Sequence, residues 1–400
     1  MKKIIAAFSA LVIFTIFAVS VLMTPNNILY FLNWGEYIDH DLIQKFQEEY
    51  HCQVIEETVT SSEAMYQKIT SNTTEYDVAI PGDYTVHQLY NEGKLKKLDV
   101  ENPKYQYLSS YKTMFNSSLS EIMKKYMVND ENNGFNEYYM PYFWGAYSIL
   151  YNSQKEDVEQ VIQNNGFKSF YDRSLFKEDV KIGMYSTARW IVSSYLLSKD
   201  LDPNITSYDG KKENDFDSTL KSDIITALKN IKFDEFGDDS LKRNVVNGTL
   251  DFCYTQLGDF FDALYLLSSE GKVNDNNFHV YVPKTTACFF DSMVIPTTCQ
   301  NETLANEFIN FMMNPTNAYQ NARTVGYSPT LKEVDNLFIK NADEGEMYYE
   351  DENTSFSLKE FLNRYPMYLN PLYNSTNVYL LEPKSNDYLT TCETIFNNLA

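Results

Sequence analysis

Runs of apolar, strand-forming residues and stretches of helical periodicity follow one another in turn over the first part of the chain. The first run, 28–32, breaks at Asn33 and Gly35, and apolar residues then recur at three- and four-residue spacing. Alternation of this kind predicts a mainly parallel sheet with helices on both faces. The predicted strands are 28–32, 53–58 and 76–80, and a predicted helix follows each of them, at 39–50, 61–69 and 84–92.

The rest of the chain repeats both patterns less regularly. Residues 101–136 are polar with few periodic apolar positions, so we predict an irregular segment there, and 202–217 is predicted as a surface loop. Residues 143–146, around Gly145, separate two apolar strands and are predicted as a hinge between two lobes. Further strands are predicted at 138–142, 147–151, 180–184, 250–254, 278–282 and 292–296, and helices at 188–196, 220–228, 240–247, 301–313, 318–326, 358–363 and 389–399.

Aromatic and acidic side chains stand just after two of the predicted strands. Trp34, Glu36 and Tyr37 follow the first strand, and Asp83 and Tyr84 follow the strand at 76–80. In an open α/β sheet, ligands bind beyond the carboxyl ends of the strands. Ring faces attract positive charge and carboxylates pair with it, so these residues suit an organic cation. Trp34 and Tyr37 could instead pack the loop, and Asp83 could be a turn residue or a helix cap.

The first 25 residues form a separate segment. Lys2 and Lys3 precede an uncharged stretch, 4–23, of about the ~20 residues that a membrane-spanning helix needs. We predict an uncleaved N-terminal anchor with the rest of the chain outside the cytoplasm. A cleaved signal peptide, which would leave a periplasmic or secreted protein, is the alternative, since Ala18-Val19-Ser20 is a weak cleavage site. No second segment of this kind occurs, so we do not expect the chain to be a permease itself.

Composition narrows the classes of partner and cofactor. A chain of 400 residues with 44% hydrophobic residues can form two domains. A net charge of −22 excludes nucleic acid as a partner, because no basic stripe neutralises phosphates. It is compatible with cationic ligands, although it could serve solubility alone. The five cysteines and four histidines show no metal-ligand spacing. We therefore predict no metal and no cofactor, and one cysteine pair could be bridged.

Seven short motifs, in their order along the chain, resemble the spermidine/putrescine-binding proteins of bacterial ABC importers. Each motif is weak by itself, and together they cover residues 29 to 327. They are LYFLNWGEY (29–37), YDVAIPGDY (76–84), GKLKKLD (93–99), PYFWGA (141–146), DSMVIP (291–296), FINFM (308–312) and VGY (325–327).

The resemblance implies an α/β fold of the type II periplasmic-binding-protein class, with a ligand cleft between two lobes. It places residues 26–143 and about 290–340 in lobe 1, and residues 144–289 and about 341–400 in lobe 2, after the N-terminal segment 1–25. In the family, Phe289 and Gln256 fall where tryptophans form the cleft wall, and Asp291 falls where a carboxylate pairs with an amine. The ligand-binding residues expected in this chain are Trp34, Glu36, Tyr37, Asp83, Tyr84, Gln256, Phe289 and Asp291.

The function that the resemblance implies is the substrate-binding subunit of an importer. Such a protein, expected to be a monomer, clamps one polyamine by hinge closure and presents it to separate ABC permease subunits. This chain departs from the family at the start of the helix 188–196. Thr187 and Trp190 stand where the family has two acidic residues. Asp83 and Asp259 could supply carboxylates from other directions, or the ligand could be another small organic cation.

Two other classes of function stay open. An enzyme could use Glu36 and Asp291 as an acid/base pair, as a glycosidase does. The sequence has no G-x-S-x-G, H-E-x-x-H or Gly-rich phosphate loop, so we predict that the protein is not an enzyme. The third class is a surface interaction module with a degenerate cleft, which the missing acidic residues near Trp190 favour and the aromatic residues around Trp34 disfavour.

Overall fold

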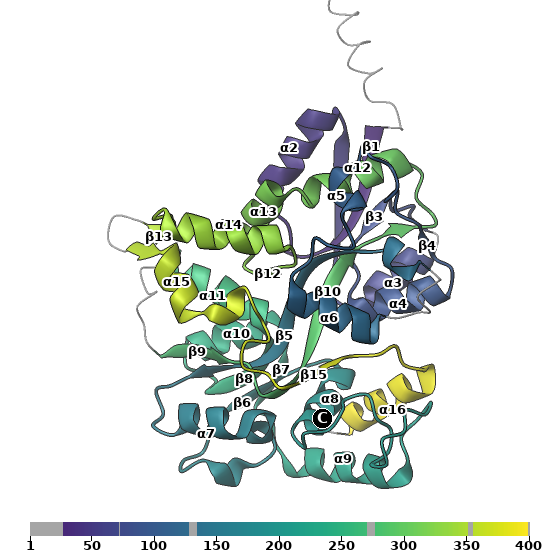
Figure 1. Cartoon of the computed structure of the whole chain (residues 1–400). Helices are drawn as coiled ribbons and strands as arrows, with labels where there is room; N and C mark the ends of the chain where they lie inside the picture. The colour runs from purple at the N-terminus through teal and green to yellow at the C-terminus, as the bar shows by residue number, and fades with distance from the viewer. Residues whose placement is uncertain (1–26, 72, 128–133, 270–276, 351–354, 399–400) are drawn as a thin grey trace, which may run out of the picture. The chain divides into compact units, whose positions relative to one another are not determined.

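The computed structural model describes residues 27–71, 73–127, 134–269, 277–350 and 355–398 (Figure 1). Contacts divide these residues into two compact units. Unit 1 takes its described residues from 1–115, 128–142 and 291–325, and unit 2 from 116–127, 143–290 and 326–400. The predicted N-terminal anchor lies outside the described residues. Within the described ranges, no helix is long and apolar enough to span a membrane.

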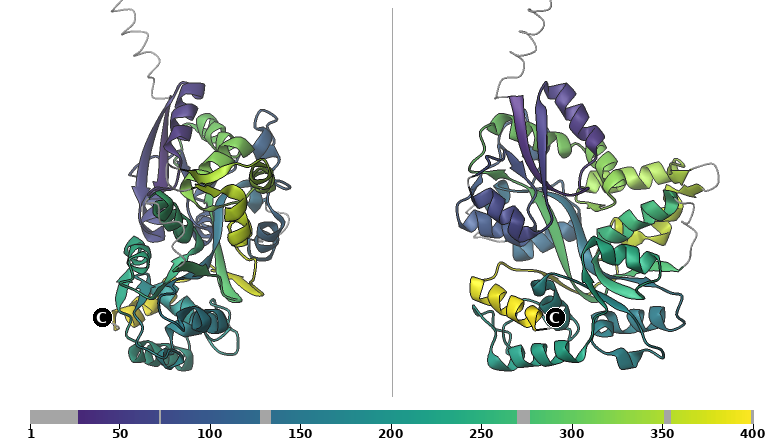
Figure 2. Two further views of the ribbon diagram at one scale, coloured as in Figure 1. Left: turned by 90° about the vertical axis from the view of Figure 1, so that its left-hand side faces the viewer. Right: turned by 180° about the vertical axis from the view of Figure 1, so that it is seen from behind.

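Unit 1 is built on a three-stranded parallel sheet. The central strand β1 (Ile28–Trp34) pairs with β2 (Gln53–Val59) on one side and with β3 (Val78–Ala79) on the other. Helices α2 (His40–Tyr50) and α3 (Ser62–Thr70) connect successive strands, and β1 and β2 run side by side in both views of Figure 2. This β-α-β-α-β order confirms the alternation predicted from the sequence.

A later part of the chain completes the core of unit 1. Phe308 of α12 (Glu302–Met312) packs its ring 5.1 Å from that of Phe31 on β1 and 5.0 Å from that of Phe46 on α2. The segment before α12 also returns to unit 1, because β11 (Ile295–Pro296) pairs antiparallel with β4 (Leu95–Lys96). The remaining helices of unit 1 are α4 (Asp83–Asn91), α5 (Gln106–Ser109) and α13 (Pro315–Val325).

Unit 2 contains most of a mixed sheet, whose described strands run in the order β15-β10-β5-β8-β6-β7. The pair β5–β8 is antiparallel, whereas β6 runs parallel to both β7 and β8. The parallel arrangement predicted for the first part of the chain therefore does not extend to this sheet. The strands are β5 (Met140–Asn152), β6 (Ile182–Tyr185), β7 (Glu235–Gly237), β8 (Phe252–Gln256), β10 (Thr285–Met293) and β15 (Asn377–Leu380), with β9 (Phe278–Tyr281) and β12 (Ser328–Pro329) paired to β5.

The helices of unit 2 include several that the sequence did not predict. The predicted helices correspond to α8 (Ala188–Leu197), α9 (Ser218–Asn230), α10 (Asp239–Val246), α15 (Leu358–Arg364) and α16 (Asn386–Asn397). The helices missed are α6 (Ser117–Tyr126), α7 (Val158–Asn165), α11 (Leu257–Ser269) and α14 (Lys332–Asp343), and the hairpin β13 (Met347–Glu350) with β14 (Ser355–Ser357) was missed too. Helix α6 lies in the stretch predicted as irregular, because only Leu119 and Ile122 are buried on it and its hydrophobic pattern is short.

The first correction concerns the strands predicted at 138–142 and 147–151, which form the single strand β5. The hinge predicted at 143–146 stays a prediction, because the boundary between the two units falls within this strand, between Tyr142 and Phe143. Strand β5 runs without a break from Met140 to Asn152, so residues 143–146 do not interrupt it. Gly145 is required for space and not for a turn, because an added Cβ would lie 2.8 Å from Cζ of Phe289. The second correction concerns β10, which already begins at Thr285. Phe289 and Asp291 are therefore strand residues and do not precede the strand.

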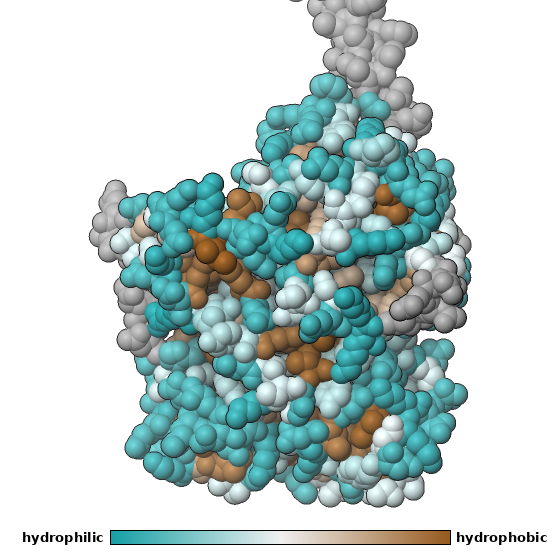
Figure 3. Space-filling view, in the orientation of Figure 1, coloured by the Kyte–Doolittle hydropathy of each residue, from teal (hydrophilic) through white to brown (hydrophobic). Residues whose placement is uncertain are grey.

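Three further facts concern the division into units, the cysteines and the surface. Residues 116–127 and 326–340 pack with unit 2, whereas the sequence analysis assigned them to lobe 1. All five cysteines are free thiols, and four of them are buried. Hydrophilic residues cover most of the face seen in Figure 3, which agrees with the strongly acidic composition.

We expect Gly145→Ala to destabilise the protein by about 1–3 kcal/mol, because the added methyl group overpacks the contact with the Phe289 ring. Urea unfolding monitored by fluorescence measures this loss. The matched control is Gly35→Ala, since nothing lies within 4 Å of a Cβ added at Gly35. Equal stability of Gly145→Ala and the wild type would contradict the packing argument.

Candidate functional site

The carboxyl end of β1 presents three of the predicted residues. The indole Nε1 of Trp34 donates a hydrogen bond to the carbonyl oxygen of Ile80, 2.8 Å away, which fixes the ring beside the end of β3. Glu36 is exposed and has a φ of 53°, in the left-handed region that non-glycine residues rarely adopt. Strain of this kind is often found at ligand sites. Tyr37, by contrast, is buried.

Tyr37 and Asp291 lie 254 positions apart in the sequence and are in contact in the fold. The hydroxyl of Tyr37 donates to Oδ2 of Asp291 at 2.6 Å. Asp291 forms an antiparallel bridge with Gly82, in the turn that follows β3, and a Cβ at Gly82 would lie 3.3 Å from Oδ1 of Asp291. The backbone of Tyr37 is held as well, because Tyr142 donates its hydroxyl to the Tyr37 carbonyl and in turn accepts from Asn321. Within unit 1, the ends of β1 and β3 thus meet the end of β10.

The charge of Asp291 is sensitive to pH near neutrality. Burial raises the pKa of its carboxyl to about 7, and the hydrogen bond from Tyr37 opposes this effect. A cation placed beside the carboxyl would favour its ionised form and lower the pKa again.

The other two predicted residues of unit 1 lie at the start of α4. Asp83 is 2% exposed and is the first residue of the helix, where a carboxylate is favoured by the helix dipole. The preceding N-cap residue, Gly82, makes no side-chain cap. Tyr84 is half-buried. Burial leaves Asp83 less accessible to a ligand than Glu36.

Unit 2 holds Gln256 and Phe289 against a group of aromatic rings. The rings of Tyr147 and Tyr327 lie 5.6 and 6.3 Å from that of Phe289, measured between centroids. Trp190, on the first turn of α8, packs against Tyr147 at 5.4 Å and against Tyr185 at 4.8 Å. We call this group the aromatic wall, and its members are Tyr147, Tyr185, Trp190, Phe289 and Tyr327.

The carboxylate of Asp259 is hydrogen-bonded to two members of the aromatic wall, Tyr185 and Tyr327. Its Oδ2 accepts from the hydroxyls of Tyr185 and Thr255 and from the backbone N–H of Gln256, and its Oδ1 accepts from the hydroxyl of Tyr327. The same hydroxyl lies 3.2 Å from the side-chain oxygen of Gln256, so its one proton is shared between the two acceptors. Burial raises the pKa of Asp259, and the charge of Lys242 opposes this effect. Asp259 therefore positions side chains of unit 2.

Sequence reasoning missed part of this group. Tyr147 and Tyr185 were not singled out, although Tyr185 is the last residue of β6 and so meets the same strand-end criterion as Trp34. Tyr327 was noted only within a motif, and Trp190 only as a departure from the family. Two of the four donors of Asp259 lie on β8, and the other two are Tyr185 at the end of β6 and Tyr327 just before β12, so no local pattern reveals the whole group.

Comparison of the sequence with protein families shows which family the chain belongs to. Residues 41–348 match the family described as bacterial extracellular solute-binding protein. The chain belongs to this family.

Curated relatives of this solute-binding protein include polyamine-binding proteins. It is 27% identical over 323 residues to the spermidine/putrescine-binding periplasmic protein of Escherichia coli K12, covering 76% of this chain and 78% of the relative. It is 24% identical over 319 residues to the putrescine-binding periplasmic protein PotF of the same organism, covering 77% and 79%. The resemblance to spermidine/putrescine-binding proteins seen in the motifs is thereby confirmed.

Solved structures show the same fold. A putative spermidine/putrescine ABC transporter from Listeria monocytogenes aligns with a TM-score of 0.65 at 24% identity, covering 93% of this chain and 98% of that one. The Tp0655 (TpPotD) lipoprotein of Treponema pallidum aligns with a TM-score of 0.68 at 18% identity, covering 93% and 99%. The two-lobed α/β fold of periplasmic binding proteins, expected from the motifs, is therefore shown.

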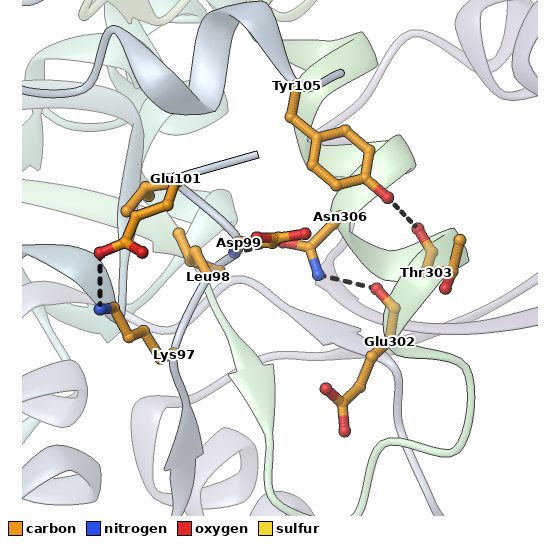
Figure 4. Close-up of a pocket in the computed structure, with 9 residues that line it drawn as sticks. Lys97, Leu98, Asp99, Glu101, Tyr105, Glu302, Thr303 and Asn306 are labelled. Atoms are coloured by element: carbon orange, nitrogen blue, oxygen red, sulfur yellow. Dashed lines mark hydrogen bonds and ion pairs between the residues drawn. The ribbon is translucent and has the colours of Figure 1, made fainter. Parts of the chain in front are cut away.

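A pocket elsewhere in unit 1 of this solute-binding protein contains none of the predicted site residues. It has a volume of about 380 Å³. Its exposed carboxylates already have partners, since Glu101 pairs with Lys97 and Glu302 with Lys96. Figure 4 shows the lining residues that it labels, Lys97, Leu98, Asp99, Glu101, Tyr105, Glu302, Thr303 and Asn306. Within the described ranges, no group of His, Cys, Asp and Glu side chains could hold a metal ion.

We expect the Asp291 carboxyl to titrate near pH 7, because burial disfavours its charge. Carboxyl ¹³C NMR of the ligand-free protein measures the midpoint. In Tyr37→Phe the midpoint should move higher, since the hydroxyl that stabilises the carboxylate is lost. A midpoint near the ordinary value of about 4, or no change in Tyr37→Phe, would contradict this account.

Proposed function

We propose that this solute-binding protein binds a polyamine, or a closely related small organic cation, for an ABC importer. The observation that carries the proposal is the Tyr37–Asp291 pair beside Trp34 and Glu36 at the end of β1. Two carboxylates and two aromatic rings at one strand end suit an alkyl ammonium group. The spermidine- and putrescine-binding relatives support the same ligand class.

Each of the four side chains has a separate role in this proposal. The ionised Asp291 pairs with the ammonium group while Tyr37 keeps the carboxylate oriented. Trp34, whose N–H is already bonded to Ile80, offers only its ring faces, and a desolvated cation–π contact contributes about 2 kcal/mol. Glu36, which is exposed, supplies a second negative charge. Asp83, Tyr84, Gln256 and Phe289 stay in the proposed binding set.

We further propose that units 1 and 2 act as the two lobes. A ligand that contacts residues of both units stabilises the closed state over the open one, which is how hinge closure is driven. The closed form is then presented to separate permease subunits on the outer face of the membrane. In this proposal the protein is a monomer, its N-terminal segment anchors it, and Glu36 and Asp291 bind without catalysing a reaction.

We expect Asp291→Asn and Trp34→Ala each to weaken spermidine or putrescine binding by about 1–3 kcal/mol, measured by titration calorimetry. The first variant loses a charge-assisted pair and the second an aromatic face. Glu49→Gln is the matched control, because Glu49 is an exposed carboxylate on α2 away from the strand end. Wild-type affinity in Asp291→Asn would refute the assignment.

Binding should also depend on pH. A cation binds the ionised form of Asp291, whose pKa is raised to about 7 in the free protein. Affinity should therefore fall as the pH drops from about 8 to about 5.5, by up to about tenfold per pH unit below 7. In Asp291→Asn this component should vanish. An affinity profile that is flat in the wild type would contradict a role for the Asp291 charge.

A further inference from the structure

One buried side chain of α13, Asn321, holds the loop between β1 and α2 that carries Glu36 and Tyr37. Its Oδ1 accepts from the backbone N–H of Asp39 at 2.9 Å, and its Nδ2 donates to the hydroxyl of Tyr142 at 2.6 Å. That hydroxyl donates in turn to the carbonyl oxygen of Tyr37 at 3.0 Å. Asn321 therefore fixes two backbone groups of the loop, one directly and one through Tyr142.

The direction of each of these hydrogen bonds is determined by the groups at its ends. The N–H of Asp39 can only donate, so the atom of Asn321 that faces it is the amide oxygen. The amide nitrogen must then donate to the hydroxyl of Tyr142, which gives its own proton to the Tyr37 carbonyl. Burial and the nearby carboxylates of Glu56 and Asp39 raise the pKa of Tyr142, so this hydroxyl stays protonated at neutral pH.

The same bonds continue to the ligand-binding pair at the end of β1. Tyr142 contacts Tyr37 with its ring as well, since the ring centroids lie 5.8 Å apart at an interplanar angle of 69°. The hydroxyl of Tyr37 then donates to Oδ2 of Asp291 at 2.6 Å. We call Asn321, Tyr142 and Tyr37 the Asn321 relay. Its members and Asp291 all belong to unit 1.

Helix α13 holds the α2 end of the loop with two further side chains. Asp39 caps α2, because its Oδ1 accepts from the backbone N–H of Asp41. Its Oδ2 accepts from Nε2 of Gln320 at 3.0 Å and from the hydroxyl of Thr324 at 2.9 Å. These bonds remain when Asn321 is replaced, so the replacement should act mainly on the Tyr37 end of the loop.

We infer that Asn321 and Tyr142 are positioning residues of the cation site. Neither contacts the ligand, and both act by holding Tyr37 where its hydroxyl meets the carboxylate of Asp291. Because Asn321 is 1% exposed and Tyr142 is 4% exposed, a lost partner leaves a buried polar group that water does not easily reach. The inference rests on the proposed function for the identity of the ligand, whereas the contact between Tyr37 and Asp291 can be measured without one.

Two variants interrupt the Asn321 relay at different points. Tyr142→Phe keeps the ring and removes the hydroxyl, and Asn321→Leu keeps the volume and removes the amide. In each ligand-free variant the Asp291 carboxyl should titrate at a higher pH than in the wild type, measured by carboxyl ¹³C NMR, because the hydrogen bond from Tyr37 lowers its pKa. The rise should not exceed the rise in Tyr37→Phe, which removes that bond outright.

The affinity for spermidine or putrescine should fall in the same two variants. We expect a loss of about threefold to tenfold in titration calorimetry, the size of effect that one hydrogen bond has. Thermal unfolding checks that both variants are folded. A merely structural role would lower the unfolding temperature and leave the Asp291 midpoint unchanged.

Two matched controls remove buried hydrogen bonds that do not reach the loop. Asn317, also on α13, is 2% exposed and bonds Lys45 and the backbone of Phe311. Tyr139 is 1% exposed, and its hydroxyl donates to the side chain of Asn136. Asn317→Leu and Tyr139→Phe should therefore lose stability and leave the Asp291 midpoint and the ligand affinity unchanged.

A double variant separates action through Tyr37 from a direct effect on Asp291. In the Tyr37→Phe background, adding Tyr142→Phe should move the Asp291 midpoint no further, because the bond that Tyr142 supports is already absent. A further rise there, or unchanged midpoints in both Tyr142→Phe and Asn321→Leu, would overturn the inference. If the midpoints shift as expected and the wild type binds neither spermidine nor putrescine, the proposed function fails and the positioning role stands.

Discussion

The hydrogen bond from Tyr37 to Asp291 joins residues 254 positions apart, and the unit 1 site depends on it. It requires β1 to be the central strand, so that its end lies beside the turn after β3, and it requires β10 to return to that turn through the bridge to Gly82. The bond also resolves a conflict. A buried carboxyl is costly when charged, yet a cation-binding site needs that charge. The hydrogen bond from Tyr37 offsets part of the cost of burying the charged carboxylate, and a bound ammonium group would offset more of it.

The buried carboxylates of the two units, Asp291 and Asp259, are stabilised in different ways. In unit 1, Asp291 accepts a hydrogen bond from the Tyr37 hydroxyl, and burial raises the pKa of its carboxyl to about 7. In unit 2, Asp259 is enclosed by four donors. The first arrangement leaves a carboxylate able to respond to a ligand, whereas the second uses the carboxylate to order Tyr185 and Tyr327. The two carboxylates, each bonded to a tyrosine hydroxyl, therefore differ in the number of hydrogen bonds that they accept.

The sequence predicted those features of the fold and the site that depend on a local pattern of residues. Alternating strands and helices revealed the first sheet, and the strand-end criterion found Trp34 and Tyr37. The sequence could not show that Gly145 makes room for the ring of Phe289, because the two residues are far apart along the chain. The donors around Asp259 were hidden for the same reason, since Tyr185 precedes it by 74 positions.

Titration calorimetry of residues 26–400 with spermidine and putrescine, at low and at physiological salt, tests the central claim most directly. The account predicts saturable one-to-one binding that persists at physiological salt, because the ammonium group is held by a partly buried carboxylate and aromatic rings, which salt screens only weakly. Heat that vanishes with added salt would contradict the account. It would mean that only the net charge of −22 attracts the cations.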